Sequence, residues 1–172
     1  GLLCTGAVWT TRPLWQPFAG HASRDRRRLE ISTMSTAKLV LQGRKIVKGQ
    51  ASGEAVVTSE AISFNGGVDN MTGIVTEPGH ELEGVNIAGK VLVFLTGKGS
   101  TGGSYKIYDM VSRGTAPVAF IQVNPEPITT IGAIIGNIPV VAGLNENPTT
   151  AIATGDFIEL DADAGKVEVT KK

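Results

Sequence analysis

The stretch VLVFLTGKGSTGGSY (residues 91–105) joins an apolar segment to a turn rich in glycine and hydroxyl groups. The segment VLVFL (91–95) is short and apolar on both faces, which is typical of a central strand. The nine residues after Thr96 include four glycines and a lysine, and glycines that lead into a helix leave backbone N–H groups free to bind an anion. We therefore expect a carboxylate or phosphate site here, with Ser100 near the centre of the turn.

The segment SYKIYDMVSRG (104–114) is predicted to be the helix that follows this turn. Its apolar and aromatic residues recur at helical spacing from Tyr105, and Gly114 follows a basic residue, as is typical of a helix end. Ser104 is expected to cap the first turn. The order of strand, glycine-rich turn, helix and strand predicts a right-handed crossover. The turn would then lie at the carboxyl end of the sheet, where ligands usually bind.

The rest of the folded part is also predicted to consist of short strands, turns and a helix. Strands are predicted at 38–41, at 54–58 with a β-branched continuation to Phe64, at 117–123 and at 138–143, with a short apolar helix at 128–137. Residues 154–169, TGDFIELDADAGKVEV, have the pattern of a C-terminal β-hairpin. The predicted fold class is α/β, a mixed barrel or sandwich with helices on one side.

Composition restricts the classes of function. The chain has 172 residues, 41% of them hydrophobic and 19% charged, which is typical of a single folded domain with a hydrophobic core. The formal net charge is zero and no basic stripe with interleaved aromatics is present, which disfavours a nucleic-acid partner. No apolar run approaches the roughly 20 residues that span a bilayer, so no membrane association is expected.

The first 33 residues differ from the rest and are predicted to be a disordered leader. They hold five arginines against two acidic residues and contain the single cysteine, Cys4. Two interpretations are open: an organellar presequence, or upstream sequence translated ahead of the start-like Met34. We prefer the second, expect the domain to span 34–172, and expect a cytoplasmic location.

From Met34 onward, the sequence offers no conventional metal or nucleophile site. No cysteine is present and His80 is the only histidine, so we expect neither a structural disulfide nor a metal site in this domain. His80 lies in a polar loop and is interpreted as a surface or interface residue. Gly99 interrupts the spacing that a nucleotide P-loop requires, and Ser100 has no recognisable histidine and aspartate partners for acyl transfer.

The glycine-rich turn also has a purely structural interpretation, because such turns join strands to helices in many folds. A second candidate segment is AISFNGGVD (61–69), in which Gly66 and Gly67 allow the backbone to approach a substrate. Asp69 is interpreted as a turn cap rather than a ligand.

Several segments together resemble the small subunit of aconitase X enzymes. They are AISFNGGVD (61–69), TG (72–73), GVNIAGKVLVFLTGKGSTGGSY (84–105), RGTAPVAFI (113–121), EPITTIGAIIGNIPVV (126–141) and TGDFIELDADAGKVEV (154–169). They occur in the family's order and cover nearly all of 38–170. The resemblance implies a swivelling β/β/α barrel-like domain, equivalent to the mobile domain of aconitases.

The resemblance also implies a hydro-lyase that is active only with a large subunit. That partner is expected to form a heterodimer with this chain and to hold an iron–sulfur cluster, while this chain binds no cofactor. The substrate is expected to be a hydroxylated carboxylate such as mevalonate 5-phosphate or cis-3-hydroxy-L-proline, and the sequence does not choose between the two.

In the family, the serine of the GKGS turn is the proposed proton acceptor, which corresponds to Ser100. The substrate-binding residues are expected to be Gly97, Lys98, Gly99, Thr101 and Gly102, with Gly66 and Gly67. Asn65 stands where the resemblance suggests an aromatic residue, which leaves its role open. The alternative is a non-catalytic swivelling carrier or regulatory domain, although this chain lacks the histidine that phosphohistidine carriers need.

Overall fold

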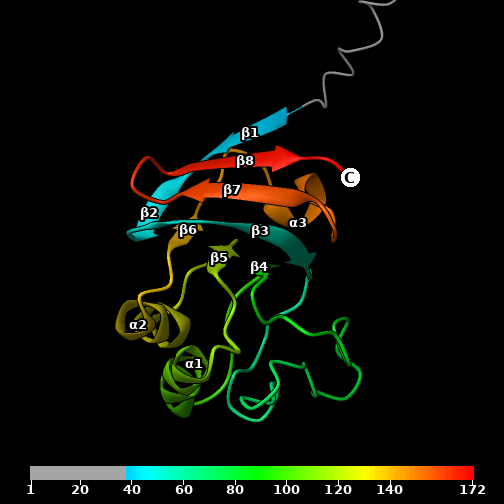
Figure 1. Cartoon of the computed structure of the whole chain (residues 1–172), viewed down its shortest axis with the longest axis vertical. Helices are drawn as coiled ribbons and strands as arrows, with labels where there is room; N and C mark the ends of the chain where they lie inside the picture. Colours follow the sequence, from blue (N-terminus) through cyan, green and yellow to red (C-terminus); the bar gives the residue numbers. More distant parts are fainter. Residues whose placement is uncertain (1–37) are drawn as a thin grey trace, which may run out of the picture. The chain divides into compact units, whose positions relative to one another are not determined.

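Two layers of strands, two longer helices, one short helix and their connecting loops make up residues 38–172, the part of the chain that the computed structural model describes (Figure 1). The strands are β1 Lys38–Gln42, β2 Arg44–Val47, β3 Gln50–Val57, β4 Val91–Phe94, β5 Ala119–Gln122, β6 Val140–Ala142, β7 Phe157–Asp161 and β8 Lys166–Thr170. The helices are α1 Gly102–Arg113, α2 Pro127–Gly136 and α3 Pro148–Ala151. The predicted leader, residues 1–33, lies outside the described residues.

The strands form one curled sheet in the order β1-β8-β7-β3-β4-β5-β6-β2. The neighbours from β3 to β6 are parallel, and the remaining pairs are antiparallel. Only Gly43 separates β1 from β2, although these strands lie at opposite ends of the order. The sheet must therefore curl until its two ends meet, which confirms the predicted barrel-like α/β fold with a C-terminal hairpin, β7–β8.

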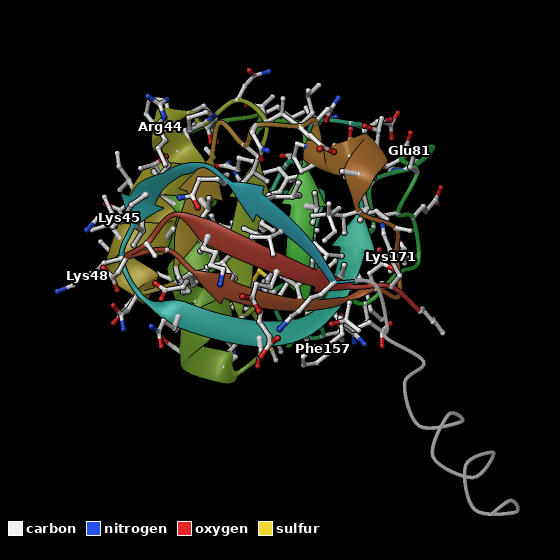
Figure 2. All side chains as sticks on the ribbon, turned by 90° about the horizontal axis from the view of Figure 1, so that it is seen from above. Arg44, Lys45, Lys48, Glu81, Phe157 and Lys171 are labelled. Atoms are coloured by element: carbon white, nitrogen blue, oxygen red, sulfur yellow. The ribbon has the colours of Figure 1, made fainter. Side chains whose placement is uncertain are left out.

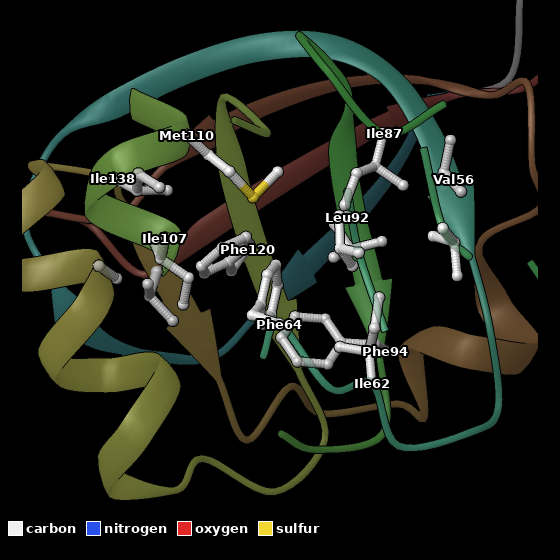
Figure 3. Close-up of a cluster of buried hydrophobic side chains, with 14 of the residues drawn as sticks. Val56, Ile62, Phe64, Ile87, Leu92, Phe94, Ile107, Met110, Phe120 and Ile138 are labelled. Carbon is white, nitrogen blue, oxygen red and sulfur yellow. The ribbon is translucent and has the colours of Figure 1, made fainter. Parts of the chain in front are cut away.

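Strand β4 explains why VLVFL is apolar on both faces. Val91 and Val93 belong to the cluster that fills the space between the two strand layers. Leu92 and Phe94 belong to a second cluster, which includes Ile107 and other residues of the helices (Figure 3). Because both faces of β4 are covered, the strand is fully buried.

The structure confirms most of the predicted elements, corrects one of them and adds two. Strand β2 and the short helix α3 were not predicted. The predicted continuation of a strand from residue 58 to Phe64 is wrong, because β3 ends at Val57 and only Ile62 makes an isolated bridge, to Gly97. The chain turns where Glu81 binds the Thr58 hydroxyl and both the backbone N–H and the hydroxyl of Ser59. No helix within residues 38–172 is long and apolar enough to cross a membrane.

Candidate functional site

The carboxyl ends of β3, β4 and β5 lie at one edge of the sheet because these strands are parallel. The loops that follow them carry both glycine-rich segments singled out in the sequence. Two backbone hydrogen bonds join these segments, from Ile62 N to Thr96 O at 3.0 Å and from Lys98 N to Ile62 O at 2.9 Å. The AISFNGG segment and the GKGSTGG turn therefore lie side by side.

Ser100 is exposed on this edge and has a side-chain partner from the neighbouring segment. The Asn65 amide Nδ2 donates a hydrogen bond to Ser100 Oγ over 2.9 Å. Phe64 anchors Asn65, since its buried ring packs against Phe94 and Phe120 with centroid separations of 6.4 and 5.6 Å. A Cβ on Gly102 would lie only 2.9 Å from Asn65 Nδ2, so the absence of a side chain there makes room for this contact.

The N-terminus of α1 begins directly after Ser100. Its N-cap residue, Thr101, makes no side-chain capping hydrogen bond, and the first turn contains no acidic residue. The partial positive charge of the helix dipole is therefore not neutralised by a cap and lies beside the serine.

The predicted capping role of Ser104 is wrong. Helix α1 starts at Gly102, two residues earlier than predicted, so Ser104 lies inside the helix rather than before it. Its buried side chain faces α2, and the Oγ donates a hydrogen bond to Ile128 O over 2.7 Å. Ser104 thus joins the two helices.

Helix α2 begins beside the same turn, but its N-terminus is already occupied. The Glu126 carboxylate accepts hydrogen bonds from Ile128 N at 2.7 Å and Thr129 N at 2.6 Å. A Cβ on Gly97 would overlap this carboxylate, which explains the glycine at that position. The sequence analysis did not identify Glu126, although an acidic residue before Pro127 is a recognisable capping signal. Of these two helices, only α1 lacks a side-chain cap, although Gly103 N and Ser104 N donate to Ser100 O and Thr101 O over 2.9 and 3.2 Å.

Lys98 projects from the turn and is paired with a carboxylate. Its Nζ donates to Glu77 Oε1, and Lys98 keeps 44% of its side chain exposed. The second oxygen of Glu77, Oε2, is buried and has no hydrogen-bond partner among the described residues. Lys98 is therefore accessible to solvent at the site, but it is held by Glu77 rather than by Ser100.

The two glycines of the second segment differ in their surroundings. Gly66 has a positive φ of 93°, and no atom lies within 4 Å of the position that its Cβ would take. A Cβ on Gly67 would lie 2.5 Å from Ser63 O, so Gly67 is needed for packing. Only Gly66 presents open backbone at this point. Their predicted role in substrate binding stays a prediction.

His80 is buried rather than at the surface, which corrects the sequence interpretation. It is 7% exposed, and its Nδ1 accepts a hydrogen bond from Leu82 N over 3.0 Å. The second ring nitrogen lies 3.8 Å from Glu60 Oε2. Residues 38–172 contain no cysteine and no group of three or more potential metal-binding side chains. They do not fit an iron–sulfur cluster, and the expectation that a partner holds one stays a prediction.

Residues 40–169 match the family model described as the aconitase X swivel domain. The chain belongs to this family. The swivel domain is 48% identical over 130 residues to the phosphomevalonate dehydratase small subunit of Methanocella arvoryzae, a match that covers 76% of this chain and 98% of the relative. It is 46% identical to the protein of the same name from Pyrococcus furiosus, with coverages of 75% and 94%.

Solved structures agree with this assignment. The crystal structure of Thermococcus kodakaraensis aconitase X in its holo-form is similar, with a TM-score of 0.72 and 47% identity over 76% of this chain and 98% of that one. A solution NMR structure of a UPF0107 protein has a TM-score of 0.69 and 44% identity, with coverages of 77% and 98%. The predicted resemblance to aconitase X small subunits is thereby confirmed.

Proposed function

We propose that this swivel domain is the small subunit of a phosphomevalonate dehydratase and that Ser100 is the base of the elimination. One observation carries the assignment of activity: the domain matches 98% of the length of a relative with that name at 48% identity. The base assignment rests on Ser100, which is exposed beside the Asn65 amide and directly before α1, a helix whose N-terminus has no side-chain cap.

The chemistry requires two events on the substrate. A C–H bond next to the carboxylate breaks and its proton passes to a base, while the C–O bond to the hydroxyl breaks and a double bond forms. In this proposal the Ser100 alkoxide takes the proton and becomes a hydroxyl. The departing hydroxyl is assigned to groups of the large subunit, since no described side chain of this chain is suited to accept it.

A serine hydroxyl is a weak acid, so its alkoxide needs strong stabilisation. The Asn65 N–H points at Oγ, and the α1 N-terminus adds partial positive charge beside it. The hydrogen bond from Asn65 and the helix dipole stabilise the alkoxide most strongly when water is excluded from the site. Lys98 supplies a cation for the carboxylate or phosphate of the substrate, once that anion competes with Glu77.

The test is a dehydratase assay of the full chain, reconstituted anaerobically with the aconitase X-type large subunit of the same organism. Mevalonate 5-phosphate is expected to react, and cis-3-hydroxy-L-proline to be inert. Ser100→Ala should abolish turnover but keep the complex, whereas the control Ser112→Ala removes an exposed serine that bonds only within α1, to Tyr108 O, and should leave turnover unchanged. Full activity of Ser100→Ala would refute the base assignment.

A complex that dehydrates neither substrate would favour the alternative, a swivelling domain without chemistry of its own. Reaction of cis-3-hydroxy-L-proline alone would keep the hydro-lyase but change the substrate. A heterodimeric state and a cytoplasmic location stay predictions.

A further inference from the structure

Large apolar side chains that remain exposed are concentrated on α1 and α2. Within residues 38–172 these helices carry five of them: Tyr105, Tyr108, Ile131, Ile134 and Ile135, which are between 46% and 74% exposed. The other three, Val40, Met71 and Phe157, are distributed over β1, a loop and β7. Single exposed apolar residues are normal on a protein surface, but a cluster of this size indicates an interaction site.

Three of the clustered side chains, Tyr105, Ile131 and Ile135, border a hollow between the two helices, here named the α1–α2 groove. It has a volume of about 390 Å³, and its walls include Tyr105, Ile128, Ile131 and Ile135. None of the residues that line it carries a charge. A hollow of this kind accepts an apolar or aromatic side chain of a partner, which is the usual anchor at the centre of a protein interface.

The α1–α2 groove is continuous with the candidate site. Thr101 lines the groove and directly follows Ser100. The Ser100 alkoxide needs a surface that excludes water, and Ser100 itself is exposed in this chain. A partner that fills the groove from Thr101 onward therefore also covers the serine.

We propose that the large subunit docks on the α1–α2 groove and that this contact places Ser100 in the shared active site. The proposal rests on the proposed function, because it takes its partner from there. A second copy of this chain is a poorer occupant, since it brings only a second Ser100 and no group that accepts the departing hydroxyl. The strand layer that contains β1 and β8 lies on the side of the domain away from α1 and α2 (Figures 1 and 2). This layer is not expected to contact the large subunit.

The test compares charges introduced at matched exposed aliphatic positions in the full chain. Ile131→Asp changes a side chain in the wall of the groove, which is 50% exposed, and Ile134→Asp changes a neighbouring side chain of the exposed cluster, which is 56% exposed. Val40→Asp serves as the control on β1, where the side chain is 48% exposed. Binding to the large subunit is measured by calorimetry, turnover by titration with large subunit to saturation, and folding by thermal denaturation.

Ile131→Asp is expected to raise the Kd for the large subunit by about tenfold or more, as for central interface residues, and Ile134→Asp to raise it less. The kcat of Ile134→Asp at saturation should stay close to that of the wild type, and Val40→Asp should bind normally. Wild-type affinity of both α2 variants would overturn the proposal, as would a wild-type homodimer in light scattering that these variants dissociate. Binding without dehydration in the wild type would instead refute the proposed function and leave the docking surface standing.

Discussion

At the residue scale, the contact between Asn65 and Ser100 leads to a specific prediction. If the Asn65 N–H stabilises the Ser100 alkoxide over 2.9 Å, then Asn65→Ala should lower kcat by about 100-fold, as the loss of one oxyanion donor typically does. Asn65→Asp should lower kcat further, because its carboxylate repels an alkoxide. The measurement is steady-state kinetics of the reconstituted complex.

The pH profile separates this effect from a structural one. With the donor removed, the ascending limb of the kcat/KM profile, along which the base loses its proton, should move to higher pH in Asn65→Ala, because the alkoxide forms less readily. KM and the melting temperature should change little, since Asn65 is exposed. An unchanged pH profile with a lower melting temperature would mean that Asn65 only supports the loop.

This contact marks the limit of sequence reasoning about the site. The anion-binding character of GKGSTGG follows from local sequence, because glycines before a helix act through the backbone. Asn65 lies 35 positions from Ser100, and only the parallel arrangement of β3 and β4 brings their following loops together. The position of Ser104 was also beyond local rules, since its contact with Ile128 depends on the packing of α1 against α2.

At the element scale, Glu168 links β8 to β1 by charge. Hydrogen bonds from Lys166, and then from Lys38 on β1, lower the pKa of this carboxyl from 4.5 to about 2. A group whose pKa is lower in the folded state stabilises the fold above its unfolded pKa, and this contribution disappears as the pH falls through the folded pKa. The contribution of Glu168 is therefore complete above pH 4.5 and is lost toward pH 2.

Glu168→Gln should accordingly reduce stability at pH 7 and flatten the decline in stability between pH 4.5 and 2. Urea denaturation at a series of pH values measures the slope. Lys166→Met should flatten the slope in the same direction, because it removes the larger cause of the pKa shift. A Glu168→Gln variant with the wild-type slope would show that the three side chains act independently in solution.

The elements that were predicted correctly are those whose signal is local. Strands β4, β5 and β6 are buried on both faces, so each appears as an apolar run whatever its neighbours are. Strand β2, RKIV, has only four residues, two of them exposed and charged, and it becomes a strand by pairing with β6 when the sheet closes. Helix α3 has only four residues, too few for a helical period to be recognised.

At the scale of the whole molecule, the fold depends on a corner where β1 crosses into β2. Gly43 forms this corner, and its N–H donates to Gly165 O, in the β7–β8 turn, over 2.8 Å. A Cβ on Gly43 would lie 2.8 Å from Ala142 O. A Cβ on Gly165 would overlap the carbonyl oxygen of Gly43. The two ends of the curled sheet therefore meet where neither glycine has room for a side chain.

Gly165→Ala should for this reason destabilise the domain more than an ordinary glycine substitution with a similar backbone. Gly89→Ala is the matched control, because its φ of 69° is close to the 64° of Gly165 and no atom lies within 4 Å of its added Cβ. The control should cost about 1 kcal/mol for the left-handed backbone alone. Gly165→Ala should cost about 2–4 kcal/mol, because the corner must also open. Equal losses in chemical denaturation of the two variants would mean that the sheet ends separate easily and that closure contributes little to the stability of the swivel domain.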